Sequence, residues 1–427
     1  MKACYLFCRR QIGSWWWLSI VLIISVGCRA ENTVSGQPVG IGPVGASRLP
    51  TAPSSLPPAR LVPQPTSAAP ASPSPYPTSA PTDEPPKSTN KRFTIAPDDE
   101  RILYRGRYDF SDPQRPAFDW SGVSIAFSFE GSSIAIRLND GRNYYNVWID
   151  DQMRVLETAA GSHEYVLAEG LAPGEHEVVV LKRTEAYVGA AVFEGLELVG
   201  SDLGPRPERS GRLIEFIGDS ITTGYGNEGT SPDCYFTPAT QNAEQTYAAF
   251  TAAQFAADYD LIALSGLGVV RNLREEGEGS ANTAINHIDR ALGLNPAVMW
   301  PSTTRTPDAV VINLGTNDFS STPFPESIDF VSAYVELLRA VRQRYPSAYL
   351  VAVSGPLMLE PGPQLIAEAV AQFREQSNDS RTTMAVIENN LEESAVDFGC
   401  DWHPNVNGHH KIADQLAPVL ATLLGWD

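Results

Sequence analysis

The chain has 427 residues, which is long enough for two domains and linkers, and it carries a formal net charge of −19. Such an acidic surface argues against nucleic acid and anionic membranes as partners, and it suits a soluble protein that acts on neutral substrates. The five cysteines include no Cys-x-x-Cys pair and the six histidines are scattered apart from His409-His410, so we expect no structural zinc site.

Residues 1–28 predict an export signal. Three basic residues precede a short apolar stretch from Trp15 to Ile24, which is too short for a comfortable membrane span. Gly27 before Cys28 resembles a bacterial lipoprotein signal, in which Cys28 is lipidated and becomes the new N-terminus, although Ser25 stands where a Leu is usual. We expect an exported protein that is either lipid-anchored at the cell surface or, after cleavage elsewhere, freely secreted.

Residues 29–92 are rich in Pro, Ser, Ala and Thr. They hold too few side chains worth burying to offset the entropy of ordering the chain, so they predict an extended, disordered tether. Beyond this tether only Cys234 and Cys400 remain of the cysteines. In an exported protein these two could form one disulfide.

Residues 93–203 predict an all-β domain. Apolar residues alternate with period two in short runs, with turn residues between the runs and no helical periodicity. Short strands at roughly even spacing indicate a jelly-roll β-sandwich. The expected strands are 123–129, 133–138, 145–150, 163–167, 176–181 and 191–198.

Residues 208–427 alternate strand with helix. This alternation predicts an α/β domain with a doubly wound parallel sheet that is covered on both faces. The expected strands are 213–217, 261–264, 309–314, 349–353 and 384–387. The expected helices are 243–257, 281–292, 328–342, 365–376 and 409–424.

The first of these strands runs into Gly218-Asp219-Ser220. The glycine permits a tight turn, and Ser220 then sits at the carboxyl end of a parallel strand, where open α/β sheets bind their ligands. Alone, this triplet is also compatible with an ordinary boundary between strand and turn. Three further segments are expected at the same edge: Ser265-Gly266-Leu267-Gly268, Gly315-Thr316-Asn317-Asp318 and Asp401-Trp402-His403-Pro404.

These four segments supply the groups that a serine hydrolase needs. A serine hydroxyl attacks poorly until a neutral imidazole removes its proton, and His403 can act as that base. Attack on an ester carbonyl creates an oxyanion, which the Ser220 N–H, the Gly268 N–H and the Asn317 side-chain amide could stabilise. Gly266 is an alternative to Gly268 in this role.

The order of these blocks resembles the SGNH (GDSL-type) hydrolase superfamily. Together with Phe118-Asp119-Trp120-Ser121-Gly122 in the β-sandwich, it is similar to carbohydrate esterase family 2, the two-domain acetylxylan esterases, over about residues 95–427. The resemblance implies removal of O-acetyl groups from polysaccharide without a cofactor. It also implies Ser220 as nucleophile, Gly268 and Asn317 in the oxyanion hole, and His403 as base.

One position departs from the usual pattern. Most SGNH enzymes place the acid of the triad three residues before the histidine, where this chain has Cys400. The resemblance implies either Asp401 as the acid or a backbone carbonyl that orients His403, and it leaves Cys400 available to pair with Cys234. The expected partner is an acetylated polysaccharide or oligosaccharide, with a membrane contacted only through the lipid anchor.

Three aromatic residues, Tyr225, Trp300 and Trp402, are candidate platforms for sugar rings, although packing would explain each of them equally well. Two other functions fit part of the pattern. One is an SGNH lipase or thioesterase that acts on longer acyl chains. The other is a surface carbohydrate-binding protein with a silent esterase domain. The presence of Ser220, Asn317 and His403 together argues against it.

Overall fold

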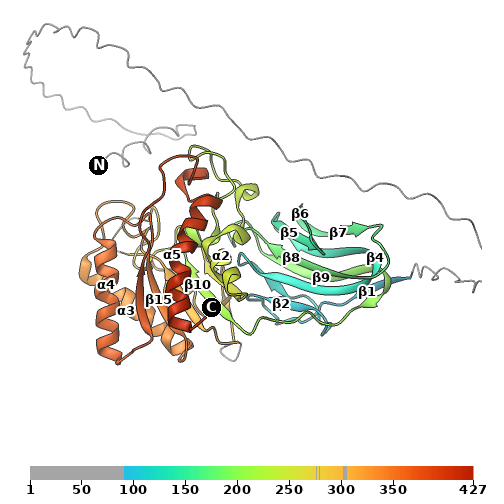
Figure 1. Cartoon of the computed structure of the whole chain (residues 1–427), viewed down its shortest axis with the longest axis horizontal. Helices are drawn as coiled ribbons and strands as arrows, with labels where there is room; N and C mark the ends of the chain where they lie inside the picture. Colours follow the sequence, from blue (N-terminus) through green and yellow to red (C-terminus); the bar gives the residue numbers. More distant parts are fainter. Residues whose placement is uncertain (1–90, 276, 278, 302–304, 427) are drawn as a thin grey trace, which may run out of the picture. The chain divides into compact units, whose positions relative to one another are not determined.

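The computed structural model describes residues 91–275, 277, 279–301 and 305–426. The predicted export signal, the lipidation at Cys28 and nearly all of the predicted tether lie outside these residues. The described residues belong to one compact unit, in which an antiparallel β-sandwich precedes a parallel sheet with helices (Figure 1). The predicted fold class is confirmed, whereas the boundaries 93–203 and 208–427 stay predictions.

The sandwich contains β1 (Arg92–Ile95), β2 (Leu103–Arg105), β3 (Ala117–Phe118), β4 (Ser124–Asp140), β5 (Tyr144–Ile149), β6 (Gln152–Glu157), β7 (Gly161–Glu169), β8 (Glu175–Lys182) and β9 (Ala191–Leu203). The later strands are β10 (Leu213–Gly218), β11 (Asp258–Ala263), β12 (Arg290–Leu292), β13 (Asn295–Met299), β14 (Ala309–Asn313), β15 (Tyr349–Ser354) and β16 (Thr382–Val386). The α-helices are α1 (Ser220–Thr223), α2 (Tyr247–Gln254), α3 (Ser327–Arg344), α4 (Gly362–Ser377) and α5 (Val406–Leu424). The described residues also form the 3-10 turns η1 (Pro238–Thr240), η2 (Ala243–Gln245), η3 (Ala284–Asn286) and η4 (Cys400–Trp402).

The long strand β4 holds the sandwich together. Its first half pairs with β2 and β8, and its second half pairs with β7 and β9, so one strand runs through both layers. The register shifts on both sides of Gly131. A Cβ at the facing Gly200 would lie 2.2 Å from the Glu130 carbonyl oxygen, so only glycine fits where β9 crosses this bend.

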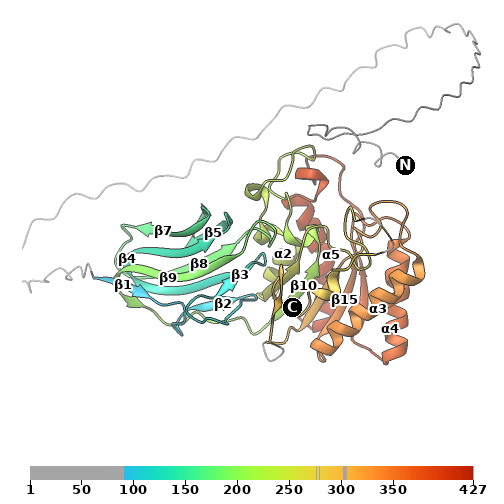
Figure 2. The same ribbon diagram turned by 180° about the vertical axis from the view of Figure 1, so that it is seen from behind.

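The parallel sheet has the order β11-β10-β14-β15-β16. Alternate residues of its strands point to opposite faces, because side chains alternate along a strand. Ile214, Phe216 and Val311 pack in one cluster with α2 and α5, whereas Ile217 and Ile312 pack in the other with α3 and α4. The two views in Figures 1 and 2 show α5 and α3 on these opposite faces. Within the described residues, no helix is both long and apolar enough to cross a membrane.

The helix predicted over 281–292 is wrong. The structure has the 3-10 turn η3 and then the hairpin of β12 and β13. Asp119 from the sandwich explains the difference, because its carboxylate accepts from the backbone N–H of Gly293 at 2.7 Å and of Leu294 at 3.1 Å. This tertiary contact fixes a turn where local propensity favours a helix.

A buried ion pair fixes the sandwich to the parallel sheet. Arg107 is 1% exposed and its Nη2 donates to Glu215 Oε2 of β10 at 2.8 Å. Its Nη1 donates to the Ile288 and Arg290 carbonyls, and Tyr345 Oη donates to the same Glu215 oxygen. Loss of one partner from such a buried charge pair strongly destabilises the folded protein, because the other charge stays buried and unpaired. Buried hydrogen bonds and an ion pair therefore connect the sandwich to the sheet that carries Ser220.

Candidate active site

Ser220 lies at the carboxyl edge of the parallel sheet, where β10 turns into α1. A Cβ at Gly218 would lie 2.0 Å from Thr222 Oγ1, so only glycine permits this turn. Asp219 caps α1 because its Oδ1 accepts from the Ile221 N–H at 3.0 Å. The turn thus presents a half-buried Ser220 at the edge predicted from the sequence.

His403 contacts the Ser220 hydroxyl directly. Its Nε2 lies 2.8 Å from Ser220 Oγ, and its Nδ1 lies 3.0 Å from the Asp401 carbonyl oxygen. A carbonyl can only accept, so Nδ1 carries the proton and Nε2 offers its lone pair to the serine. This is the tautomer that a general base needs.

The backbone of Asp401, not its carboxylate, orients His403. Asp401 Oδ2 instead accepts from Tyr225 Oη at 3.1 Å and from the Phe236 N–H at 2.8 Å. The prediction of Asp401 as the acid of a triad is therefore corrected to the main-chain alternative. The physical reason is the left-handed backbone at Asp401 (φ 52°), which directs the carbonyl to the histidine and the side chain away from it.

Two consecutive residues of this turn, Asp401 and Trp402 (φ 58°), adopt the left-handed region that non-glycine residues rarely use. A disulfide between Cys234 and Cys400 crosses the turn, with an S–S distance of 2.11 Å. Alongside it, the Asp401 N–H donates to the Cys234 carbonyl at 2.8 Å. The loop after α1 therefore holds the backbone next to His403 through a disulfide and a hydrogen bond.

Gly229 permits the close approach of this loop to Cys400, and it was not among the residues predicted from the sequence. A Cβ there would lie 2.5 Å from both the backbone nitrogen and the Sγ of Cys400. The signal was available in the run Gly224-Tyr225-Gly226-Asn227-Glu228-Gly229, whose repeated glycines indicate close approach of another backbone.

An aromatic stack covers one side of the imidazole. The Tyr225 ring lies 4.4 Å from the His403 ring and stacks on Phe236 at 4.1 Å between ring centres. Burial by this packing lowers the pKa of His403 from its usual 6.5, against the Asp401 carbonyl and carboxylate, which raise it. His403 is consequently neutral, and able to accept a proton, at pH 7.

The predicted oxyanion-hole donors gather beside Ser220. Asn317 Nδ2 donates to Asp219 Oδ2 at 3.1 Å and to the Leu267 carbonyl at 2.9 Å. The Gly268 N–H donates to Asn272 Oδ1 at 3.0 Å. In this structure each of the two donors binds a protein acceptor, and their part in an oxyanion hole stays a prediction.

Two buried carboxylates brace these loops. Asp318 accepts from the backbone N–H groups of Val269, Val270 and Arg271 at 2.7–2.9 Å, which fixes the loop that carries Gly268. Burial, together with the charge of Asp318, raises the pKa of Asp219 to about 7.

Within the described chain, no three His, Cys, Asp or Glu side chains are placed to hold a metal ion.

Of the three candidate sugar platforms, Tyr225 contacts His403, and Trp402 precedes His403 in the chain. Trp402 is 44% exposed next to His403, while Tyr225 is partly covered by Phe236. Trp300 lies elsewhere, because its carbonyl accepts from Arg344 in the last turn of α3. That helix starts near the Asn317 loop and runs for 18 residues, about 27 Å, toward the other edge of the sheet. The structure therefore contradicts the prediction for Trp300.

Comparison with known families assigns both parts of the chain. The model described as Carbohydrate esterase 2 N-terminal matches residues 104–207. The model of the GDSL-like Lipase/Acylhydrolase family matches residues 216–411. The first covers most of the sandwich, and the second spans the segments from β10 to the start of α5 that hold Ser220, Asn317 and His403.

Individual relatives agree with these matches. The chain is 36% identical over 336 residues to the cellulase/esterase CelE of Acetivibrio thermocellus, covering 78% of this chain and 41% of that protein's length. An acetylxylan esterase / glucomannan deacetylase of Cellvibrio japonicus is 28% identical over 72% of this chain and 85% of its own length. The structure of a family two carbohydrate esterase from Clostridium thermocellum in complex with cellohexaose is 35% identical, with a TM-score of 0.71, over 76% of this chain and 100% of that one.

The lowered pKa of His403 predicts how activity falls at acidic pH. Catalysis needs neutral His403, so kcat/KM for 4-nitrophenyl acetate should fall as the pH drops through the lowered pKa, below 6.5. The Asp219→Asn variant is the control, because it removes the neighbouring group that titrates near 7 and can still cap α1. It also loses the bond from Asn317, so the position of the acid limb is compared and not its height. An acid limb centred above 6.5, or one that disappears in this variant, would contradict the assignment to His403.

Proposed function

The chain belongs to carbohydrate esterase family 2, and from that membership we propose that it is a serine esterase that removes O-acetyl groups from polysaccharide. The observation that carries this proposal is the 2.8 Å contact between Ser220 Oγ and His403 Nε2, with His403 Nδ1 turned to a carbonyl. This arrangement activates a serine hydroxyl as a nucleophile.

In the first half of the proposed reaction, Ser220 Oγ attacks the acetyl carbonyl while His403 Nε2 takes the hydroxyl proton. The developing imidazolium is stabilised by the Asp401 carbonyl at Nδ1 and by the Asp401 carboxylate nearby. His403 then gives the proton to the departing sugar oxygen, which leaves an acetyl group on Ser220.

In the second half, a water attacks the acetyl-enzyme and gives its proton to His403 Nε2. Collapse of the tetrahedral intermediate releases acetate and returns the proton to Ser220. In both halves the negative oxygen would accept from the Ser220 N–H, the Asn317 amide and the Gly268 N–H. The Asn317 amide must then exchange its neutral acceptor Leu267 O for the oxyanion, and the Gly268 N–H must exchange Asn272 Oδ1. A negatively charged oxygen accepts the stronger hydrogen bond.

The substrate that we propose is an acetylated, β-linked plant polysaccharide such as acetylxylan or glucomannan. The similarity to an acetylxylan esterase / glucomannan deacetylase of Cellvibrio japonicus supports xylan and glucomannan, and the cellohexaose complex supports a linear glycan chain. The exposed Trp402 beside His403 would supply an aromatic face for one sugar ring.

We further propose that the protein is exported and held at the cell surface by lipid on Cys28. The support is the basic, apolar and Gly-Cys pattern of residues 1–28. Labelled palmitate should enter the full-length protein made in a bacterial host and be absent from its Cys28→Ser variant. Equal labelling of the two proteins, or labelling of neither, would contradict the anchor.

The direct test of the proposed function is acetate release from acetylated xylan by the Ser220→Ala variant. We expect a loss of at least about 10³-fold relative to the unchanged protein, because the nucleophile is removed. Ser377→Ala, at an exposed serine in α4, is the matched control and should keep full activity. Undiminished acetate release by Ser220→Ala would contradict the proposal.

A further inference from the structure

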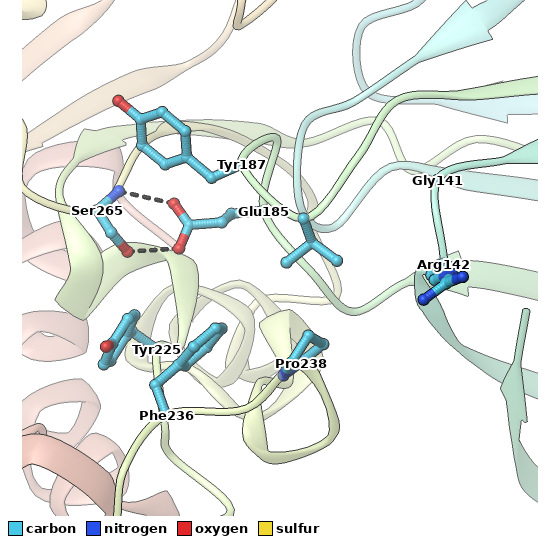
Figure 3. Close-up of a pocket in the computed structure, with 9 residues that line it drawn as sticks. Gly141, Arg142, Glu185, Tyr187, Tyr225, Phe236, Pro238 and Ser265 are labelled. Carbon is cyan, nitrogen blue, oxygen red and sulfur yellow. Dashed lines mark hydrogen bonds between the residues drawn. The ribbon is translucent and has the colours of Figure 1, made fainter. Parts of the chain in front are cut away.

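A pocket of about 410 Å³ lies beside the proposed catalytic residues, within the roughly 300–1,000 Å³ of small-molecule sites. Both parts of the fold line it, as Figure 3 shows. The sandwich contributes Glu185 and Tyr187 among others, and the α/β part contributes Tyr225, Phe236 and Ser265. Since the Tyr225 ring also packs on His403, the pocket adjoins the group that would take the proton.

The walls combine aromatic faces with one buried carboxylate. Tyr225 and Phe236 form a stacked pair on one side, and Tyr187 stands 60% exposed on the other. Glu185 lies between them, only 2% exposed. Apolar ring faces with a few fixed hydrogen-bonding groups suit a pyranose ring, which has apolar C–H faces and a rim of hydroxyls.

Glu185 keeps unused capacity to accept hydrogen bonds. Its Oε1 accepts from Ser265 Oγ at 2.5 Å and its Oε2 accepts from the Ser265 N–H at 2.7 Å. The Gln241 side chain is a third partner of the carboxylate. A carboxylate offers about four acceptor positions, so Glu185 can still accept from one sugar hydroxyl. A hydrogen bond from a hydroxyl to a carboxylate is stronger than one between neutral groups.

Several hydrogen bonds hold the segment that carries Glu185. The buried Lys182 donates through Nζ to the carbonyls of Thr184 and Glu185, at 2.6 and 3.2 Å. The Glu185 N–H donates to Gln241 Oε1 at 3.1 Å, and Arg183 Nε donates to the Gln241 carbonyl at 3.0 Å. The carboxylate is thus held in place before any ligand arrives, which reduces the entropy lost on binding.

We propose that this pocket is a glycan subsite, in which the sandwich contributes Glu185 as an acceptor for a sugar hydroxyl and Tyr187 as an aromatic platform. This inference rests on the proposed function and deepens it, because it names the neutral sugar next to the acetylated one as the group bound there. The sandwich then takes part in substrate recognition directly, in addition to supporting the sheet.

The test compares a substrate that fills the subsite with one that does not. Glu185→Gln and Tyr187→Ala are assayed on acetylated xylo-oligosaccharides and on 4-nitrophenyl acetate, which has no sugar. In both variants we expect KM for the oligosaccharide to rise about tenfold more than KM for 4-nitrophenyl acetate. Tyr187→Phe keeps the ring and should restore most of the affinity for the oligosaccharide.

Glu244→Gln is the matched control for the loss of a buried carboxylate. Glu244 accepts from Tyr259 Oη at 2.8 Å and does not line the pocket. It should leave the ratio of the two KM values unchanged. If Glu185→Gln instead lowers kcat equally on both substrates with no change in this ratio, Glu185 only braces the Ser265 loop and the inference is overturned.

A binding measurement separates this inference from the proposed function. Titration of xylohexaose into Ser220→Ala should give about tenfold weaker binding when Glu185→Gln is added. If the unchanged protein releases no acetate from any glycan but this difference is found, the proposed function fails and the subsite stands. Acetate release from glycans without this difference would retain the function and overturn the subsite, as would an absence of xylohexaose binding.

Discussion

The hydrogen bond from His403 Nδ1 to the Asp401 carbonyl is the interaction on which the site depends. It exists only because Asp401 and Trp402 both adopt left-handed backbone angles, each at a cost of about 1–3 kcal/mol. The Cys234–Cys400 disulfide and the two hydrogen bonds to the Asp401 carboxylate hold this conformation. In this protein the aspartate therefore acts on the histidine chiefly through the shape of the backbone.

The β-sandwich also contacts and supports the segments around Ser220. Arg107 fixes the sandwich to β10 through Glu215, and Glu185 fixes the loop between Ser265 and Gly268. Arg183 Nε donates to the Gln241 carbonyl, in the segment between α1 and α2 that also carries Cys234. Segments that converge on Ser220 are thus supported from outside the parallel sheet, which explains why the sandwich and the sheet belong to one compact unit.

The sequence was most informative where chemistry and topology coincide. Gly218-Asp219-Ser220, Asn317 and His403 each follow a strand or precede the last helix, so their meeting at one edge followed from parallel topology alone. It was least informative where one tertiary contact decides. Whether His403 receives the carbonyl or the carboxylate of Asp401 depends on the left-handed backbone at two residues, Asp401 and Trp402. Likewise Asp119, distant in sequence, replaces the helix expected at 281–292 with a hairpin that carries Trp300 away from the site. Glu185 gave no signal, because nothing local marks a glutamate that packs against another part of the fold.

The most direct test of this account is kcat for 4-nitrophenyl acetate in the Asp401→Asn variant. Asparagine keeps the backbone carbonyl, tolerates the left-handed conformation and can still accept from the Phe236 N–H. If the carbonyl orients His403, kcat should stay within about tenfold of the unchanged protein. A loss of about 10⁴-fold, the size expected when the acid of a triad is replaced by its amide, would show that the carboxylate does this work and would contradict the account.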